Sequence, residues 1–263
     1  MSTAETDLRG LAGRMIVRET PQALAEAAAE LLSLATESSA AARGAFTIAL
    51  SGGTSPRLLY ETLARPPWRE SIPWETWRVY FSDERASPPD DAASNYHMAR
   101  KTLLDRVPID PEHVHRMPAD SPDLDAAART YDALLEHDLP RGPGNAPRFD
   151  CVLLGLGENG HTASLFPSTP ALAVADRWVT RGQADYAPFD RLTLTFPTLN
   201  AAALVVFLVT GASKHTALRA TAEGTTPASR VHPADGVLVW LLDSPAAGTT
   251  ANQVSGRDVI PLP

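Results

Sequence analysis

FDCVLLGLGENGHTASLFP, residues 149–167, combines a short apolar run with a glycine-rich turn that carries a histidine. The apolar run, Cys151–Leu154, has the length and composition of a buried β-strand. The glycines that follow permit backbone conformations and close approaches that a Cβ atom would obstruct. In an open α/β sheet, such a turn lies at the carboxyl end of a strand, where ligands bind. The stretch therefore predicts a candidate active site at His161.

The same turn fits the pattern G-x-G-x-x-G of dinucleotide-binding sheets, at Gly155, Gly157 and Gly160. That fingerprint needs a full helix after the glycines and an acidic residue about twenty positions further on. Pro167 would interrupt such a helix, and residues 177–183 contain no acid. A bound dinucleotide is therefore not expected.

Apolar segments alternate with amphipathic ones along the chain, which is typical of an α/β fold with a mainly parallel sheet and helices on both faces. Thr20 is expected to cap a helix that starts at Pro21 and runs to Glu37. Residues 82–95 are expected to form a polar loop, and His113–Met117 a strand. The other predicted strands are Met15–Arg18, Phe46–Leu50, Arg78–Phe81, Arg191–Phe196, Leu204–Val209 and Val237–Leu242, and the other predicted helices are 58–63, Tyr96–Arg106, Asp123–His137 and Ser213–Glu223.

Composition narrows the class of protein. A chain of 263 residues can bury the core of one large α/β domain, so a single domain over 1–263 is expected. The formal net charge of −8 leaves no basic footprint for a nucleic acid, so an anionic substrate would need a local basic pocket. The only cysteine, Cys151, is expected in the core.

No membrane contact is expected. The longest apolar run, Ala201–Val209, is too short to span a bilayer as a helix. Residues 1–14 contain acids and no continuous apolar core, unlike a secretory signal, so we expect a cytoplasmic location. The oligomeric state stays open, with a monomer favoured.

Four loops after predicted strands carry residues suited to one anion site. Residues 51–56, SGGTSP, offer backbone N–H groups and hydroxyls at a helix start, which favours a phosphate. A tight strand–helix turn would explain this loop equally well. In the triplet Asp83–Arg85, Arg85 could hold an oxyanion with an acidic neighbour orienting it. The alternative is a solvated charge cluster.

The third loop carries His161, whose neutral imidazole could take a proton from water. Ser164 does not belong to a G-x-S-x-G elbow, so no serine hydrolase is indicated. His113 and His115 could share a strand face, but no third ligand is evident and no metal is expected. Ser94 is expected to cap the helix that follows it.

The fourth loop contains Lys214, which with Lys101 makes up all the lysine of the chain. Lys214 is expected near a helix start that follows a strand, a position suited to phosphate. Arg191 is another candidate anion contact. Ordinary surface charges would explain both residues as well.

Together these segments resemble the 6-phosphogluconolactonase family, within the sugar-phosphate isomerase and deaminase superfamily. The matching pieces, in the family's order over residues 49–218, are ALSGGTSP, YFSDERASP followed by SNY, VLLGLGENGHTASLFP, RLTLTFPTLN and FLVTGASKHTAL. The resemblance implies a Rossmann-like parallel sheet and hydrolysis of 6-phospho-D-glucono-1,5-lactone in the oxidative pentose phosphate pathway. It also implies that neither a metal nor a redox cofactor takes part.

The resemblance also implies roles for individual residues. His161 would be the general base that activates water against the lactone carbonyl. The family commonly reads G-x-D-G-H, and here Asn159 takes the acidic position. An amide keeps a hydrogen bond but cannot stabilise an imidazolium by charge, and we expect it to suffice because the other motifs are intact. The residues expected to bind the sugar phosphate are Gly52, Gly53, Thr54, Ser55, Asp83, Arg85, Arg191 and Lys214.

A glucosamine-6-phosphate deaminase/isomerase is the nearest alternative, because it is similar at the phosphate loop and the G-H turn. That family keeps the acid before G-H and places a glutamate further on, where this chain has Asn159 and Phe166. The two missing acid–base groups favour the lactonase. A non-catalytic sugar-phosphate-binding protein stays open because of Asn159.

Overall fold

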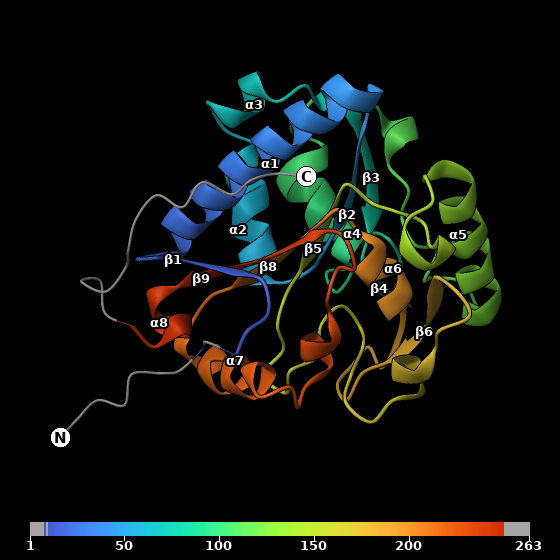
Figure 1. Ribbon diagram of the computed structural model, residues 1–263. Coiled ribbons are helices and arrows are strands. Elements are labelled where there is room, and N and C mark those ends of the chain that lie inside the picture. The colour runs from blue at the N-terminus through green and yellow to red at the C-terminus, as the bar shows by residue number, and fades with distance from the viewer. Residues whose placement is uncertain (1–7, 9, 250–263) are drawn as a thin grey trace.

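The computed structural model describes Leu8 and residues 10–249. Of the predicted domain over 1–263, residues 1–7, 9 and 250–263 lie outside the described part. Most of residues 1–14, the segment compared with a secretory signal, therefore lies outside it as well. Within the described part, a six-stranded parallel sheet has the order β1–β9–β8–β5–β2–β3 (Figure 1). Its strands are β1 (Arg14–Arg18), β2 (Phe46–Leu50), β3 (Trp77–Phe81), β5 (Cys151–Leu154), β8 (Leu204–Val209) and β9 (Val237–Asp243).

Helices flank this sheet, which confirms the predicted fold class. α1 (Pro21–Arg43) packs against β1, β2 and β9, and α2 (Thr54–Leu63) lies beside it. α7 (His215–Ala222) and α8 (Ser244–Ala247) lie across the sheet from α1 in Figure 1. Every residue of β5 and β8 is buried, Cys151 included. Burial on both faces explains why these central strands are continuous apolar runs.

Capping residues set the ends of α1. The Thr20 side chain accepts a hydrogen bond from the Ala23 backbone N–H at 3.1 Å, as a helix cap should. The helix ends at Gly44, whose φ of 73° is left-handed and suits glycine. It therefore continues beyond the predicted end at Glu37, because no glycine or proline interrupts it earlier.

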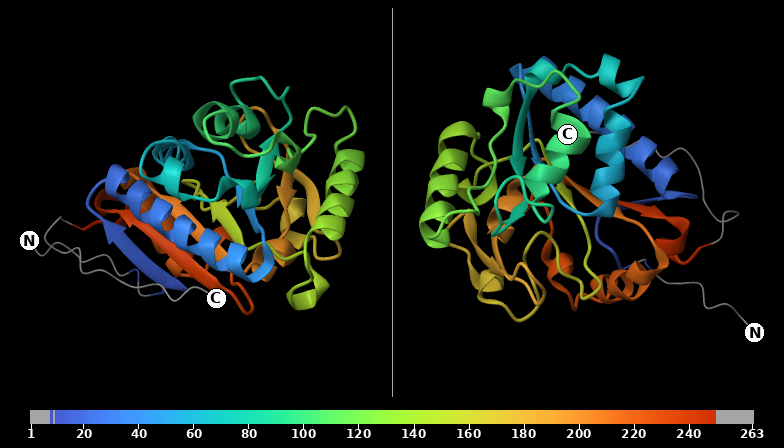
Figure 2. Two further views of the ribbon diagram at one scale, coloured as in Figure 1. Left: turned by 90° about the horizontal axis from the view of Figure 1, so that it is seen from above. Right: turned by 180° about the vertical axis from the view of Figure 1, so that it is seen from behind.

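A second sheet, antiparallel and three-stranded, accompanies the main one (Figure 2). It contains β4 (Asp83–Arg85), β7 (Asp190–Leu194) and β6 (Val179–Gln183), in that spatial order. The prediction of a loop over 82–95 is therefore wrong at β4, because β7 pairs with this short polar segment. The predicted strand Arg191–Phe196 ends at Leu194, and Phe196 begins α6 (Phe196–Ala201) with a proline in its first turn.

Two other segments differ from the prediction. His113–Met117 is not a strand, since Val114 makes only an isolated bridge to Val79. The helix predicted over Tyr96–Arg106 is α4 (Asn95–Ala99), which continues as a π-helical turn over Arg100–Leu104. The remaining helices are α3 (Trp68–Ser71), α5 (Leu124–Asp138) and the short 3₁₀ segments Trp74–Thr76, Pro111–His113, Pro143–Asn145, Pro170–Ala173, Ala212–Lys214 and Pro227–Arg230.

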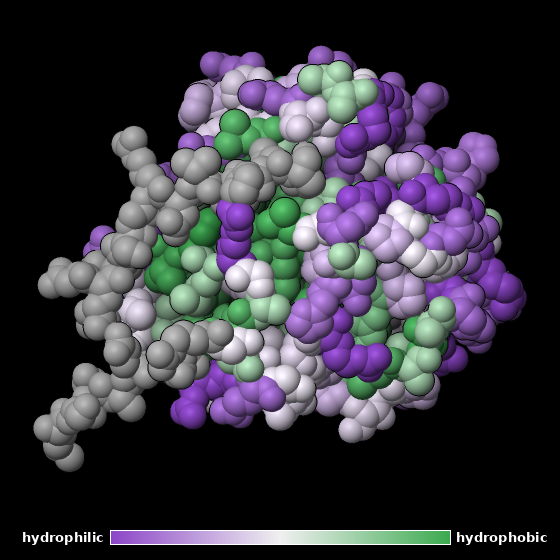
Figure 3. All heavy atoms as spheres, viewed as in Figure 1, coloured by the Kyte–Doolittle hydropathy of each residue, from purple (hydrophilic) through white to green (hydrophobic). Residues whose placement is uncertain are grey.

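The visible surface is uneven in polarity. Hydrophilic residues cover much of the side that carries α5 and β6, whereas hydrophobic residues gather over β1 and β9 (Figure 3). Met15 of β1 is one of the exposed large apolar residues, at 43%. Among the described helices, none combines the length and the apolar character needed to cross a bilayer.

Candidate active site

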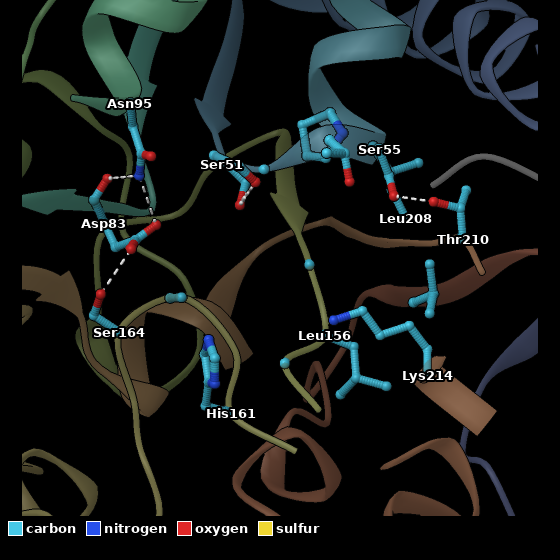
Figure 4. A pocket seen from close by; sticks show the side chains of 18 of the residues that line it. Ser51, Ser55, Asp83, Asn95, Leu156, His161, Ser164, Leu208, Thr210 and Lys214 are labelled. Atoms are coloured by element: carbon cyan, nitrogen blue, oxygen red, sulfur yellow. Dashed lines mark hydrogen bonds between the residues drawn. The ribbon is translucent and has the colours of Figure 1, made fainter. Parts of the chain in front are cut away.

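A pocket of about 190 Å³ lies at the carboxyl ends of the central strands, where loops of both sheets meet (Figure 4). Its wall comes from the loops after β2, β5 and β8 together with β4 and β7. Asn159 stands outside the lining and bonds to a residue within it. The predicted site residues that line the pocket are Gly52, Gly53, Thr54, Ser55, Asp83, Arg85, His161, Arg191 and Lys214.

The glycine-rich turn after β5 is shaped around His161. The Gly157 N–H donates to the His161 carbonyl oxygen at 2.8 Å. A Cβ atom at Gly157 would lie 2.0 Å from His161 Nδ1, and one at Gly160, where φ is 77°, would lie 2.4 Å from Thr226. These glycines therefore make room for the histidine ring and the turn. Within described residues 161–169 no helix follows them, which agrees with the rejection of a dinucleotide fingerprint.

Contacts on two sides hold the His161 ring. Phe166 stacks on it with centroids 3.9 Å apart and planes 19° apart. Asn159 Oδ1 lies 2.6 Å from His161 Nδ1 and also accepts from the His161 backbone N–H at 3.1 Å. Because an amide oxygen only accepts, Nδ1 carries the proton in this arrangement. The lone pair is then on Nε2, the nitrogen that a general base would use.

The surroundings of His161 favour its neutral form. Burial has the largest effect and lowers its pKa to about 4. Asp83 and Asp185 oppose this shift, while Lys214 and Arg191 add to it. At neutral pH the imidazole is therefore free to accept a proton.

We expect His161 to titrate well below an exposed histidine. An NMR titration should show its ring signals constant between about pH 8 and pH 6 and moving only as the pH approaches its pKa of about 4. The unfolded chain binds the proton first, near pH 6.5. The free energy of unfolding should therefore fall as the pH drops from about 6.5 to about 4. Loss of the signals in His161→Ala makes the assignment, and a midpoint at or above pH 6.5 would contradict the burial argument.

The loop after β2 presents the start of α2 to the pocket. Gly53 precedes this ten-residue helix with φ 104°, and no side chain caps it. Its first backbone N–H groups are thus available to an anion, which the helix dipole also favours. Ser55 and Thr210 share a hydrogen bond of 2.7 Å between their hydroxyls. A Cβ atom at Gly52 would lie 1.9 Å from the Asn95 side chain, so this loop needs glycine there.

Lys214 approaches from the loop after β8. Figure 4 shows its ammonium group extending into the pocket toward Leu156, with His161 entering from another side. The loop is anchored where the Gly211 N–H donates to the Asp243 carboxylate at 3.0 Å. The lysine and the start of α2 therefore face one space, as the sequence predicts.

Arg85 and Arg191 are directly opposite each other on β4 and β7. Like charges in this arrangement destabilise a sheet unless something compensates them. Arg191 is only 1% exposed, and burial followed by the charge of Arg85 lowers its pKa. Among the described residues, Nε and Nη2 of Arg191 and Nε of Arg85 have no hydrogen-bond partner. The pair thus offers spare donors to an anion in the pocket.

Asp83 is occupied by neighbouring side chains. Its carboxylate accepts from Ser164 Oγ at 2.7 Å and from Asn95 Nδ2 at 3.2 Å. Because Asn95 also packs over Gly52, Asp83 connects β4 to both the loop after β2 and the turn that carries His161. A structural role for Asp83 is therefore visible, and contact with a substrate stays a prediction.

Glu84 is 3% exposed, so the alternative of a solvated charge cluster is wrong. Its carboxylate accepts from Ser94 Oγ at 2.9 Å and from three backbone N–H groups, those of Arg85, Asn95 and Tyr96, at 2.7–2.8 Å. Burial raises the pKa of Glu84, and these four donors oppose that rise. Ser94 caps α4 as predicted, accepting from the His97 N–H at 3.1 Å.

We expect Glu84→Gln to lower the free energy of unfolding by about 1–3 kcal/mol. The amide would turn an NH₂ group toward donors that need an acceptor, leaving a buried polar group unsatisfied. Urea unfolding of the variant beside Glu30→Gln, a change at an exposed position of α1, would measure the difference. Equal midpoints for the two variants would show that the Glu84 network contributes nothing.

Sequence reasoning missed several residues at this site. Asn95 was expected only as the last residue of the polar loop over 82–95, yet it lines the pocket and bonds to Asp83. Tyr186 lines the pocket from the loop between β6 and β7, and its ring lies 5.1 Å from the Arg191 guanidinium carbon. No local signal identifies this hairpin, because β6 reads VTRGQ, which lacks regular alternation.

The described residues hold no group of three or more His, Cys, Asp or Glu side chains placed to bind a metal. His115, weighed as a ligand, stacks on Tyr80 with centroids 4.7 Å apart. Burial, its largest influence, lowers the pKa of His115. Its stacked position fits a role in packing.

Known proteins resemble this chain over most of its length. A family model described as glucosamine-6-phosphate isomerases/6-phosphogluconolactonase matches residues 19–240. A 6-phosphogluconolactonase of Synechocystis sp. is 46% identical over 211 residues, which are 78% of this chain and 85% of that protein. The structure of 6-phosphogluconolactonase from Trypanosoma brucei has a TM-score of 0.80 at 30% identity, covering 90% of this chain and 98% of its own.

A monomeric glucosamine-6-phosphate deaminase of known structure is also similar, with a TM-score of 0.75 over 89% of this chain and 99% of its own. Its identity of 23% supports a shared fold alone. The family model covers well over half of the sequence, and the Synechocystis relative agrees with it in both identity and coverage. The chain therefore belongs to the family of glucosamine-6-phosphate isomerases and 6-phosphogluconolactonases.

Proposed function

We propose that this protein is a 6-phosphogluconolactonase, which hydrolyses 6-phospho-D-glucono-1,5-lactone to 6-phosphogluconate. The observation that carries the proposal is the His161 ring, whose Nδ1 contacts Asn159 Oδ1, in a pocket that also holds Lys214 and the start of α2. The name of the Synechocystis relative supports the same substrate. The reaction belongs to the oxidative pentose phosphate pathway.

The phosphate of the substrate would bind at the start of α2. Gly52, Gly53, Thr54 and Ser55 supply backbone N–H groups and hydroxyls there, and Lys214 supplies a positive charge. Arg85 and Arg191 would add donors to the anionic end, with Asp83 holding the loops in place. Their buried, unpartnered nitrogens support this assignment.

The chemical step would begin at His161. Nε2 takes a proton from water as the oxygen attacks the lactone carbonyl, and the carbonyl electron pair moves onto its oxygen. When this tetrahedral oxyanion collapses, the bond to the ring oxygen breaks and the imidazolium returns its proton to that oxygen. Ring opening thus leaves a carboxyl group at one end and a hydroxyl at the other. Imidazole activates the water in this scheme, so the proposal needs neither a metal nor a redox cofactor.

The deaminase alternative shares the fold, so only the site can separate the two activities. In place of the glutamate expected of a deaminase, Phe166 stacks on the His161 ring. An amide, Asn159, replaces the other acid. A deaminase needs proton transfers that these two side chains cannot perform, which favours the lactonase.

Two assays run side by side test the proposal. One follows opening of 6-phosphogluconolactone after subtraction of the spontaneous reaction, and the other follows ammonia release from glucosamine 6-phosphate. We expect acceleration in the first assay alone. Ammonia release would support the deaminase instead, and tight phosphogluconate binding without turnover would support a binding protein.

The proposed catalyst is a single chain. A monomer is the oligomeric state that we propose. One domain over 1–263 and a cytoplasmic location stay predictions.

A further inference from the structure

Asn159 lies between His161 and a second carboxylate. Its Nδ2 donates to Asp185 Oδ2 at 3.2 Å, while its Oδ1 faces His161 Nδ1 at 2.6 Å. The three side chains thus form one hydrogen-bonded series from the hairpin loop after β6 to the ring in the pocket. The acidic residue common in the family is missing at position 159, but the amide that replaces it is hydrogen-bonded to the carboxylate of Asp185.

Both ends of the Asn159 amide are fixed by groups that have only one hydrogen-bonding role. The carboxylate of Asp185 can only accept, so it attracts the NH₂ end. The backbone N–H of His161 can only donate, so it attracts the oxygen end at 3.1 Å. These two constraints select the same amide orientation, in which Oδ1 accepts a hydrogen bond from the Nδ1–H of His161.

We propose that Asp185 is a positioning residue of the reaction: its carboxylate orients the Asn159 amide, and this amide holds His161 in the Nδ1–H tautomer that leaves Nε2 free for water. The inference rests on the proposed role of His161 as general base. Asp185 does not line the pocket, and its hydrogen bond reaches His161 by way of Asn159.

The charge of Asp185 would also help the imidazolium that forms during the reaction. Asp185 and Asp83 stabilise positive charge on His161, whereas Lys214 and Arg191 oppose it. The neighbouring rings, Phe166 and Tyr186, carry no formal charge. A carboxylate that acts through a polarised amide can replace part of the stabilisation that an aspartate bonded directly to the histidine would give to its imidazolium.

The hairpin loop that carries Asp185 is held at both ends. The Ala184 N–H donates to the Phe189 carbonyl oxygen at 2.7 Å, which closes the loop. Next to Asp185, Tyr186 packs edge-on against Phe166 with centroids 5.7 Å apart. The same loop therefore contacts both the amide and the ring that stacks on His161, so the position of Asp185 is defined although its side chain is exposed.

Asp185→Ala should lower kcat by about 10-fold or more while changing KM little, by analogy with the partners that orient metal-ligating histidines, which typically account for ~10–100-fold. Long-range ¹H–¹⁵N NMR of the ring nitrogens, recorded on the free protein near pH 7, should show the Nδ1–H tautomer in the wild type and a mixture of tautomers in the variant. Asp185→Asn keeps an acceptor but loses the charge, so it should keep the tautomer and lower the His161 pKa.

A rescue and a control make the test specific. The double variant Asn159→Asp/Asp185→Asn exchanges the amide and the carboxylate, and it should keep both the tautomer and most of the wild-type kcat. Asp190→Asn is the matched control from the same hairpin, because Asp190 pairs with Arg181 outside the pocket. It should leave both readouts unchanged.

Two outcomes would overturn the inference: an unchanged tautomer in Asp185→Ala, or equal losses of kcat in Asp185→Ala and Asp190→Asn. The NMR measurements need no substrate, so they separate this inference from the proposed function. A wild type without lactonase activity, but with a tautomer that depends on Asp185, would contradict the function and still support the positioning role.

Discussion

Replacing His161 with alanine is expected to lower kcat for lactone opening by about 10²–10⁴-fold, the usual cost of removing a general base. Without Nε2, nothing at that point of the pocket takes the proton from water during attack on the carbonyl. Binding should persist, because the start of α2 and the ammonium of Lys214 are formed by other loops. Calorimetric titration with 6-phosphogluconate should therefore give a similar Kd for the variant and the wild type.

The control is His232→Ala, since His232 is exposed and lies outside the pocket. Both variants must be compared after subtraction of spontaneous hydrolysis, because the lactone opens unaided. Circular dichroism should confirm that loss of the Phe166 stack leaves the fold intact. Full turnover in His161→Ala would remove this residue from the mechanism, and a kcat loss equal to that of His232→Ala would have the same meaning.

The parts of the fold that sequence predicts well are those fixed by local physics. Cys151–Leu154 and Leu204–Val209 are central strands, and their uninterrupted apolar character follows directly from burial on both faces. Thr20 and Pro21 mark the start of α1 because capping and the fixed φ of proline act within one turn. The site follows from the same logic, since parallel strands bring the loops after β2, β5 and β8 to one edge of the sheet.

Strand β4 of the second sheet could not be predicted, because its partner β7 is distant along the chain. Asp83–Arg85 reads as an isolated polar triplet, and only its register with Arg191 and Thr193 makes it a strand. The same pairing buries Glu84, which charge alone would place in solvent. Asp185 and Tyr186 were missed for a related reason, because they come from a hairpin whose first strand has no regular alternation.

Lys214→Ala is expected to weaken binding of 6-phosphogluconate by about 10–150-fold, which corresponds to the loss of one charge-assisted hydrogen bond of about 1.5–3 kcal/mol. The effect should appear mainly in KM and Kd, because the ammonium binds the same phosphate before and during the reaction. Increasing salt should narrow the difference in Kd between the variant and the wild type, since salt screens part of the attraction between the ammonium and the phosphate. Calorimetry at two ionic strengths would measure both effects.

Lys101 is a matched control, because it is the chain's other lysine and lies exposed on the π-helical turn away from the pocket. Lys101→Ala should therefore bind as the wild type does, and equal Kd values for the two lysine variants would contradict the phosphate assignment.

The charge of Lys214 should also affect the pKa of His161. Since Lys214 helps to lower the pKa of this histidine, Lys214→Ala should raise that pKa in the free protein, whereas Lys101→Ala should not. Weaker phosphate binding together with a raised histidine pKa would mean that one ammonium acts on both the bound anion and the base.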